Sequence, residues 1–154
     1  MQRRSFLKGT LAGSAVAVAV GAGLLSPRAV LAAWPKAAFE AKSVKDAMSK
    51  LYGSADNTPS ADIKIKAPDI AENGAVVPVS VRTNMSNVDS IAVIAEKNGT
   101  PLASNFKLSA NTVPNVSTRI KMGKTSDVIA VVKANGKAYS ARKNVKVTIG
   151  GCGG

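Results

Sequence analysis

The sequence predicts a mainly β fold: an immunoglobulin-like β-sandwich of about seven strands, with one N-terminal helix and a flexible C-terminal arm. Three observations predict it. From residue 62 onward, apolar residues alternate with polar ones at a period of two, which is typical of half-buried strands. Turn residues separate these runs at short spacing, as in a sandwich. Residues 43–53 instead show the helical period of apolar positions.

The first 32 residues have the features of an export signal. The basic cluster Arg3-Arg4-Ser5-Phe6-Leu7-Lys8 precedes an apolar run from Leu11 to Leu25, which is shorter than the roughly 20 residues of a membrane-spanning helix. Small or modest residues before position 33 predict cleavage after Ala32. The paired arginines resemble a twin-arginine signal, although Gln2 stands where that pattern has Ser or Thr. We expect a periplasmic protein without a membrane anchor; an ordinary secretory signal is the alternative.

One helix is predicted after a short lead-in that contains Pro35. Val44, Ala47, Met48 and Leu51 form a single apolar stripe. Ser43 with Asp46 resembles a capping box, and Gly53 is a good helix stop. The linker 53–61 is too short to divide the chain, so we expect residues 33–149 to form one helix-plus-sandwich domain.

The strands are predicted from short apolar runs, at residues 63–66, 77–82, 90–96, 102–108, 117–121, 128–133, 138–141 and 145–149. Run 90–96 is more continuously apolar than its neighbours. Asn135-Gly136 is the strongest two-residue hairpin signal and joins two of the runs. The turns between other predicted strands are assigned to Asn73-Gly74, Asn98-Gly99 and Gly123-Lys124.

Composition excludes several classes of function. The chain has no His and one Cys, so it offers no ligand set for a metal or cofactor and no Ser-His-Asp or Cys-His site. We therefore expect neither a cofactor nor an enzyme. Removing Arg3, Arg4, Lys8 and Arg28 with the signal lowers the net charge from +12 to +8. The lysines are scattered and aromatic residues are few, which argues against nucleic acid as a partner.

The chemistry of the chain is concentrated at residues 150–154, Gly-Gly-Cys-Gly-Gly. Glycines offer no side chains to bury a thiol, so we expect Cys152 to be exposed on a flexible arm made with Gly150, Gly151, Gly153 and Gly154. An exposed thiol forms the nucleophilic thiolate, and nearby cations favour that form. Lys143 and Lys146 are candidates for this electrostatic support, with a solvated surface role as the alternative.

These residues resemble the SoxY family, the sulfur carriers of bacterial thiosulfate oxidation. The resemblance covers the twin-arginine signal, the helix ending Leu51-Tyr52-Gly53, the sandwich, and above all the terminal Gly-Gly-Cys-Gly-Gly. It implies that a c-type cytochrome conjugates thiosulfate to Cys152. A hydrolase then releases sulfate, and a sulfane dehydrogenase, in systems that have one, oxidises the remaining sulfur. It also implies a heterodimer with a SoxZ-like second sandwich subunit, whose export with this chain would explain a twin-arginine signal.

A second interpretation from the residues stays open. An exported immunoglobulin-like module with a structural or adhesive role could use Cys152 for an intermolecular disulfide. A glycine-rich tail suits both interpretations. Heterogeneous mass adducts on the thiol favour the carrier, whereas a dimer mass that collapses on reduction favours the module.

Overall fold

The computed structural model describes residues 34–151, so the predicted export signal at residues 1–32 lies outside the described residues. In this part of the chain, two short helices precede nine strands. The helices are α2 (Lys36–Phe39) and α3 (Val44–Tyr52). The strands are β1 (Thr58–Pro59), β2 (Ile63–Lys66), β3 (Ile70–Ala71), β4 (Val77–Thr83), β5 (Val88–Ala95), β6 (Leu102–Lys107), β7 (Asn115–Ile120), β8 (Ser126–Ala134) and β9 (Lys137–Val147).

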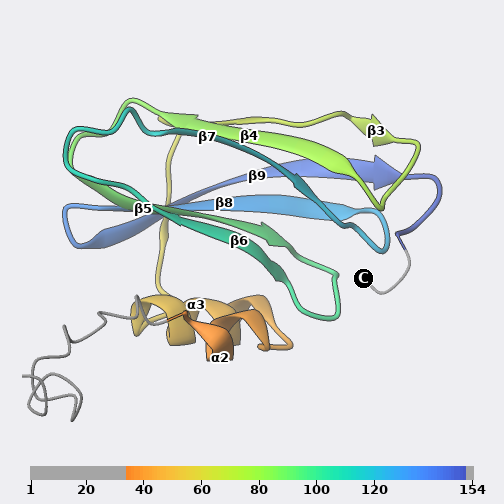
Figure 1. Ribbon diagram of the computed structural model, residues 1–154, viewed down its shortest axis with the longest axis horizontal. Helices are drawn as coiled ribbons and strands as arrows, with labels where there is room; N and C mark the ends of the chain where they lie inside the picture. The colour runs from red at the N-terminus through yellow and green to blue at the C-terminus, as the bar shows by residue number, and fades with distance from the viewer. Residues whose placement is uncertain (1–33, 152–154) are drawn as a thin grey trace, which may run out of the picture. The chain divides into compact units, whose positions relative to one another are not determined.

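The strands form two sheets. The larger has six strands in the order β1-β9-β8-β5-β6, with β3 also paired to β9, and the smaller has the order β2-β4-β7. Neighbours are antiparallel except for β1 and β3, which each run parallel to β9 over two residues. Figure 1 shows the three-stranded sheet over one face of the larger sheet and the two helices over the other.

Two apolar cores hold these three layers together. The first lies between the sheets and includes Val79 and Val81 from β4 with Val93 from β5. The second lies between the larger sheet and the helices, and includes Ile94 from β5 with Met48 from α3. The larger sheet is therefore covered on both faces.

This layering explains why the strands differ in sequence. β4 has one face on the core, and its residues alternate between buried and exposed, with Val77, Val79 and Val81 inside. β5 is buried on both faces, so all residues from Ser90 to Ala95 are buried. The continuous apolar run at 90–96 thus marks a central strand.

Helix α3 has the boundaries that its sequence predicts. The Ser43 hydroxyl accepts a hydrogen bond from the Asp46 backbone N–H at 3.1 Å, which satisfies one free donor at the helix start. Gly53 ends the helix in the left-handed conformation, with φ +82°. The apolar stripe predicted from sequence packs on the larger sheet.

The predicted mainly β sandwich is confirmed, with four differences in detail. The lead-in contains α2, and the linker 53–61 contains β1. The two-residue strand β3 is an addition. The runs predicted as two strands at 138–141 and 145–149 are joined in one strand, β9, which ends at Val147, because the polar residues between them also pair with β8.

Candidate functional site

The backbone that leads to the predicted arm is bonded to the sandwich well beyond the end of β9. The Lys146 N–H donates to the Asp69 carbonyl at 2.9 Å, and the Thr148 N–H donates to the Ala71 carbonyl at 3.1 Å. The Ile149 carbonyl then accepts from the Gly74 N–H at 2.7 Å. The chain is therefore held to the 69–74 segment up to Ile149.

The next two residues rest on a surface that we call the tail seat, made of Gly74, Ala75, Met122 and Gly123. The Gly151 N–H donates to the Met122 carbonyl at 3.1 Å, and the Met122 N–H donates to the Gly74 carbonyl at 2.7 Å. Gly74 thus bonds through its N–H to Ile149 and through its carbonyl to Met122. Gly74 therefore links its own loop, which precedes β4, both to the tail and to the loop that follows β7.

The tail and its seat approach so closely that side chains would collide. A Cβ atom added to Gly74 would overlap the Met122 carbonyl oxygen, and one added to Gly150 would overlap the Gly123 carbonyl oxygen. A Cβ on Gly151 would lie 2.8 Å from the Ala75 Cα. These contacts are with backbone atoms, which cannot rotate away. Glycine is therefore required here by packing.

Polar side chains brace the two loops of the seat. Asn98 donates to the Lys121 carbonyl at 2.7 Å and accepts from the Gly123 N–H at 3.0 Å, which fixes the loop after β7. The Asn73 side chain accepts from the Ala75 N–H at 2.9 Å and so fixes the turn that carries Gly74. The Thr125 hydroxyl accepts from the Val147 N–H at 2.9 Å.

The structure places only part of the predicted arm. Gly150 and Gly151 lie on the tail seat, whereas Cys152, Gly153 and Gly154 lie outside the described residues. A flexible arm therefore remains a prediction for those last residues. Sequence alone assigns the seat glycines at 74 and 123 to turns. The close approach of residues 74, 122 and 151 is a property of the folded chain.

The two candidate lysines lie on opposite faces of β9. Side chains three residues apart in a strand point to opposite sides, as Lys143 and Lys146 do. The Lys143 ammonium pairs with the Asp69 carboxylate at 3.1 Å. Lys146 is exposed to solvent. The structure does not bring the two cations together, and their role toward Cys152 stays a prediction.

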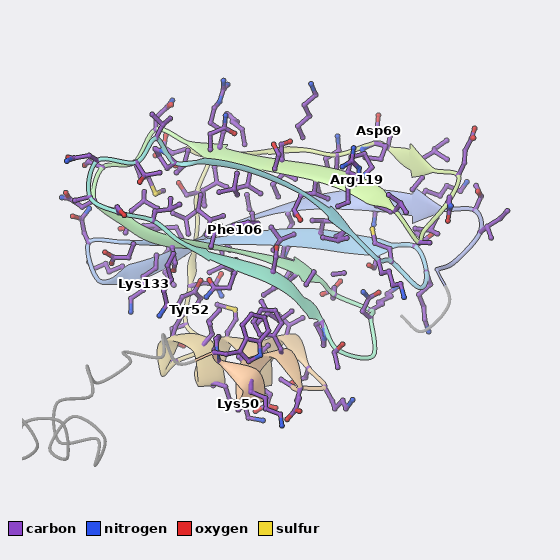
Figure 2. All side chains as sticks on the ribbon, viewed as in Figure 1. Lys50, Tyr52, Asp69, Phe106, Arg119 and Lys133 are labelled. Carbon is purple, nitrogen blue, oxygen red and sulfur yellow. The ribbon has the colours of Figure 1, made fainter. Side chains whose placement is uncertain are left out.

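A second polar region lies where α3 ends. Tyr52 and Lys133 both line two open hollows, of about 370 and about 400 Å³. The Ser90 hydroxyl donates to the Tyr52 hydroxyl at 3.4 Å, and the Lys133 ammonium lies 5.7 Å from the centre of the Tyr52 ring. Burial raises the pKa of Tyr52 above its usual 10.0, and the hydrogen bond with Ser90 opposes this in part. Figure 2 shows Tyr52 and Lys133 between the larger sheet and the helices.

Between residues 34 and 151, no three side chains of the His, Cys, Asp or Glu type gather to hold a metal ion. Within the same residues, no helix combines the length and the apolar character needed to cross a membrane.

Comparison with protein families decides the identity of this fold and tail. The family described as "Sulfur oxidation protein SoxY" matches residues 48–152, a range that spans well over half of the sequence and includes Cys152. The chain belongs to the SoxY family. The resemblance drawn from the terminal glycines and the helix is thus confirmed at the level of the family.

Solved structures agree with this SoxY assignment. The sulfur carrier protein SoxY from Chlorobium limicola f thiosulfatophilum is 41% identical, with a TM-score of 0.64, over 70% of this chain and 97% of its own. A superoxide reductase (neelaredoxin) from Ignicoccus hospitalis is 21% identical, with a TM-score of 0.50, over 55% of this chain and 79% of its own. That second likeness shows a shared fold alone. No curated protein matches the chain.

Proposed function

We propose that this SoxY-family chain is a periplasmic carrier that holds the sulfur intermediates of thiosulfate oxidation covalently on the Cys152 thiol and presents them to partner enzymes. The observation that carries the proposal is the family match, which extends to Cys152, together with a similar structure whose name is that of a sulfur carrier. The only cysteine of the sequence directly follows Gly151, which is bonded to the tail seat.

The chemistry needs one thiol and enzymes from outside the chain. Joining the Cys152 thiol to the terminal sulfur of thiosulfate forms an S–S bond and releases one proton and two electrons, which the c-type cytochrome partner accepts. Water then cleaves the bond between the sulfane sulfur and the sulfonate group. Sulfate and two protons leave, and a persulfide anion stays on Cys152. Where a sulfane dehydrogenase is present, it oxidises that persulfide.

The tail geometry supports a carrier because it fixes the backbone up to the residue that precedes Cys152. Backbone bonds hold the chain through Gly151, and Cys152 comes next. With the seat closed, the thiol extends about one residue from the sandwich. With Gly150 and Gly151 released, three residues beyond Ile149 give a reach of roughly 10 to 12 Å. Such a reach would let a partner's active-site channel receive the thiol while the sandwich stays outside.

The remaining parts of the proposal concern partners and export. We expect a heterodimer with a SoxZ-like second sandwich subunit, which is compatible with the small size and basic charge of this chain. Export of that subunit together with this chain would explain the Arg3-Arg4 signal. The partner enzymes supply every catalytic step. The chain itself acts as a substrate carrier and needs no bound cofactor.

Replacing the sulfur tests the proposal. Cys152→Ser keeps the size and flexibility of the tail but removes the nucleophile. It should abolish thiosulfate-dependent turnover in a system reconstituted with the partner enzymes, without changing the unfolding midpoint.

A relocated thiol is the matched control. Adding Ser109→Cys to Cys152→Ser places a thiol on an exposed loop. That double variant should remain inactive, because the thiol is no longer on the tail. Turnover by Cys152→Ser itself would contradict the carrier role.

A further inference from the structure

The outward face of the three-stranded sheet is strongly basic. Lys64 and Lys66 on β2, Arg82 on β4 and Arg119 on β7 are all exposed, and we call these four side chains the basic face. Their neighbours in β4 and β7 on that side are small or polar, namely Pro78, Ser80, Asn115 and Ser117. Figure 2 shows Arg119 on this side of the molecule.

Within the part of the chain that the structure describes, none of these four cations is in an ion pair. The sequences of β2, β4 and β7 contain neither Asp nor Glu. Among the described residues, ion pairs occur elsewhere and involve none of the four cations: Lys36–Glu40, Lys50–Asp46, Arg142–Glu96, Arg142–Asp127 and Lys143–Asp69. Lys36, Lys50, Arg142 and Lys143 thus take part in ion pairs, whereas the four cations of the basic face are in none of these pairs.

The arrangement is unfavourable for the isolated sheet. The register places Lys64 directly opposite Arg82 in neighbouring strands, and like charges in that position are destabilising. Their side chains also line a shallow groove of about 450 Å³ that offers hydroxyl and amide groups from Ser80, Ser117 and Asn115. The repulsion between these cations does not stabilise the sheet, and a negatively charged partner would relieve it.

The basic face adjoins the tail seat at its Arg119 end, while Lys64 and Arg82 lie toward the opposite end of the strands. Gly74 and Ala75 come shortly before β4, and Met122 and Gly123 follow β7, so the same two strands carry both features. Arg119 lies opposite Pro78, near the end of the sheet that adjoins the seat. A molecule bound on this face would therefore lie beside the origin of the Cys152 tail.

The size of the face indicates what kind of partner it fits. Strands of this length give a surface of roughly 20 Å by 15 Å, about 300 Å². A stable subunit interface buries about 800 Å² on each partner, whereas transient encounters bury less. Charge complementarity at a small interface mainly accelerates association. These properties suit an enzyme that the carrier visits and then leaves.

We propose that the basic face is the docking surface for an acidic protein surface on an enzyme that acts on the Cys152 tail; this deepens the proposed carrier function and rests on it. Carboxylates of the enzyme pair with Lys64, Lys66, Arg82 and Arg119. The enzyme's channel is thereby placed beside the tail seat.

Charge reversal tests this surface. The exported protein, with any subunit that accompanies it, is passed over the immobilised c-type cytochrome partner, and association rates are measured at several salt concentrations. The variant Lys64→Glu/Arg82→Glu should associate at least about tenfold more slowly than the parent at low salt, with a weaker salt dependence. The variant Lys66→Glu/Arg119→Glu should show the same slower association. Because two independent variants are compared, misfolding of one of them cannot account for the effect.

The control has the same change of net charge at a distant place. Lys42→Glu/Lys45→Glu alters exposed lysines beside and within α3, on the far side of the larger sheet, and should slow association less than twofold. Equal slowing by this control would show that net charge alone matters and would overturn the proposal. So would unchanged association of both charge-reversed face variants.

Two further measurements distinguish protein docking from thiol capture and from binding of a different anion. The Cys152→Ser protein should associate with the cytochrome at the parent's rate, because docking does not use the thiol. Its turnover in the reconstituted system tests the carrier role independently. Duplex DNA and free thiosulfate serve as alternative probes. The parent could bind either probe in a salt-sensitive way, and Lys64→Glu/Arg82→Glu could lose that binding while its association with the cytochrome is unchanged. This result would assign the face to that anion and refute protein docking.

Discussion

Strand β9 has glycines at both ends, and the two ends use glycine for opposite reasons. At its start, Gly136 adopts φ +74° in the turn from β8, and a Cβ there would meet nothing within 4 Å. Beyond its end, Gly150 and Gly151 lie so close to the tail seat that a Cβ would strike backbone atoms. Glycine is needed at position 136 for its left-handed backbone conformation, and at positions 150 and 151 because it has no side chain.

The difference changes how the carboxyl tail is understood. A glycine-rich terminus is easily taken as flexible throughout. Here two of its glycines, with Gly74 facing them, allow the backbone to be bound closely. The tail therefore has a fixed origin, and freedom of movement is proposed for the residues that follow Gly151.

The largest contrast is expected from alanine at the two ends. Gly74→Ala forces a Cβ into the Met122 carbonyl and should lower the free energy of unfolding by about 3 kcal/mol, because backbone cannot repack. Gly136→Ala adds only the strain of the left-handed conformation and should cost about 1 kcal/mol. Urea unfolding of both variants measures the difference.

Asparagine sharpens this test. Asn tolerates the left-handed region, so Gly136→Asn should recover most of the stability lost in Gly136→Ala. Gly74→Asn should be no better than Gly74→Ala, because its Cβ meets the same carbonyl. Rescue by Asn at position 74 would show that conformation, and not close packing, requires glycine there.

A smaller effect is expected in the tail itself. Gly151→Val places a Cβ against Ala75 and should open the hydrogen bond to the Met122 carbonyl. Loss of one such bond, about 1 kcal/mol, should speed amide hydrogen exchange at residue 151 several-fold while barely changing global stability. Gly153→Val, which lies beyond the seat, is the control and should leave that exchange rate unchanged.

Enzyme access is measured on the same two tail variants. Alkylation of Cys152 by a small reagent should stay fast in both, whereas turnover by the partner enzymes should fall. Parental turnover in the Gly153→Val protein would mean that the glycines do not serve channel access.

The sequence predicted what depends on local pattern and missed what depends on tertiary approach. Alternating Val77, Val79 and Val81 predicted β4, and Asn135-Gly136 predicted the hairpin before β9, because each signal lies within one segment. The strands β1 and β3 have two residues each and exist only through pairing with β9. Pro35, at the residue before α2, was a signal that could have revealed that helix.

The site divides in the same way. Composition and motif alone predict Cys152 and its glycines as the site, and this stays a prediction. The tail seat joins positions 74, 122 and 151, and no periodicity connects residues so far apart. The basic face likewise becomes visible only when the register places Lys64 opposite Arg82.

The smallest expected effect concerns Tyr52, which lines the hollow beside Gly136 at the other end of β9. Burial raises the pKa of Tyr52 in the folded protein above the 10.0 of an exposed tyrosine. Above pH 10 the unfolded chain therefore loses this proton more readily than the folded one. Below pH 10 the ionisation of Tyr52 should not affect stability, and as the pH rises above 10 its ionisation should lower the free energy of unfolding.

Tyr52→Phe tests that assignment by removing the titrating group. Its unfolding midpoint should decline less than the parent's between about pH 10 and 11, measured by denaturant titration. Tyr139→Phe provides the comparison at the other tyrosine of the chain. An identical decline in the parent and the Tyr52→Phe protein would refute the contribution of this phenol.

The mass of the intact protein, isolated from its host under non-reducing conditions after growth on thiosulfate, tests the central claim most directly. The carrier account predicts a series of sulfur-containing adducts on Cys152 that disappear on reduction and never form on Cys152→Ser. A single covalent dimer that reduction converts to monomer would support a disulfide-linked structural module. That result, or an unmodified thiol throughout turnover, would contradict the account.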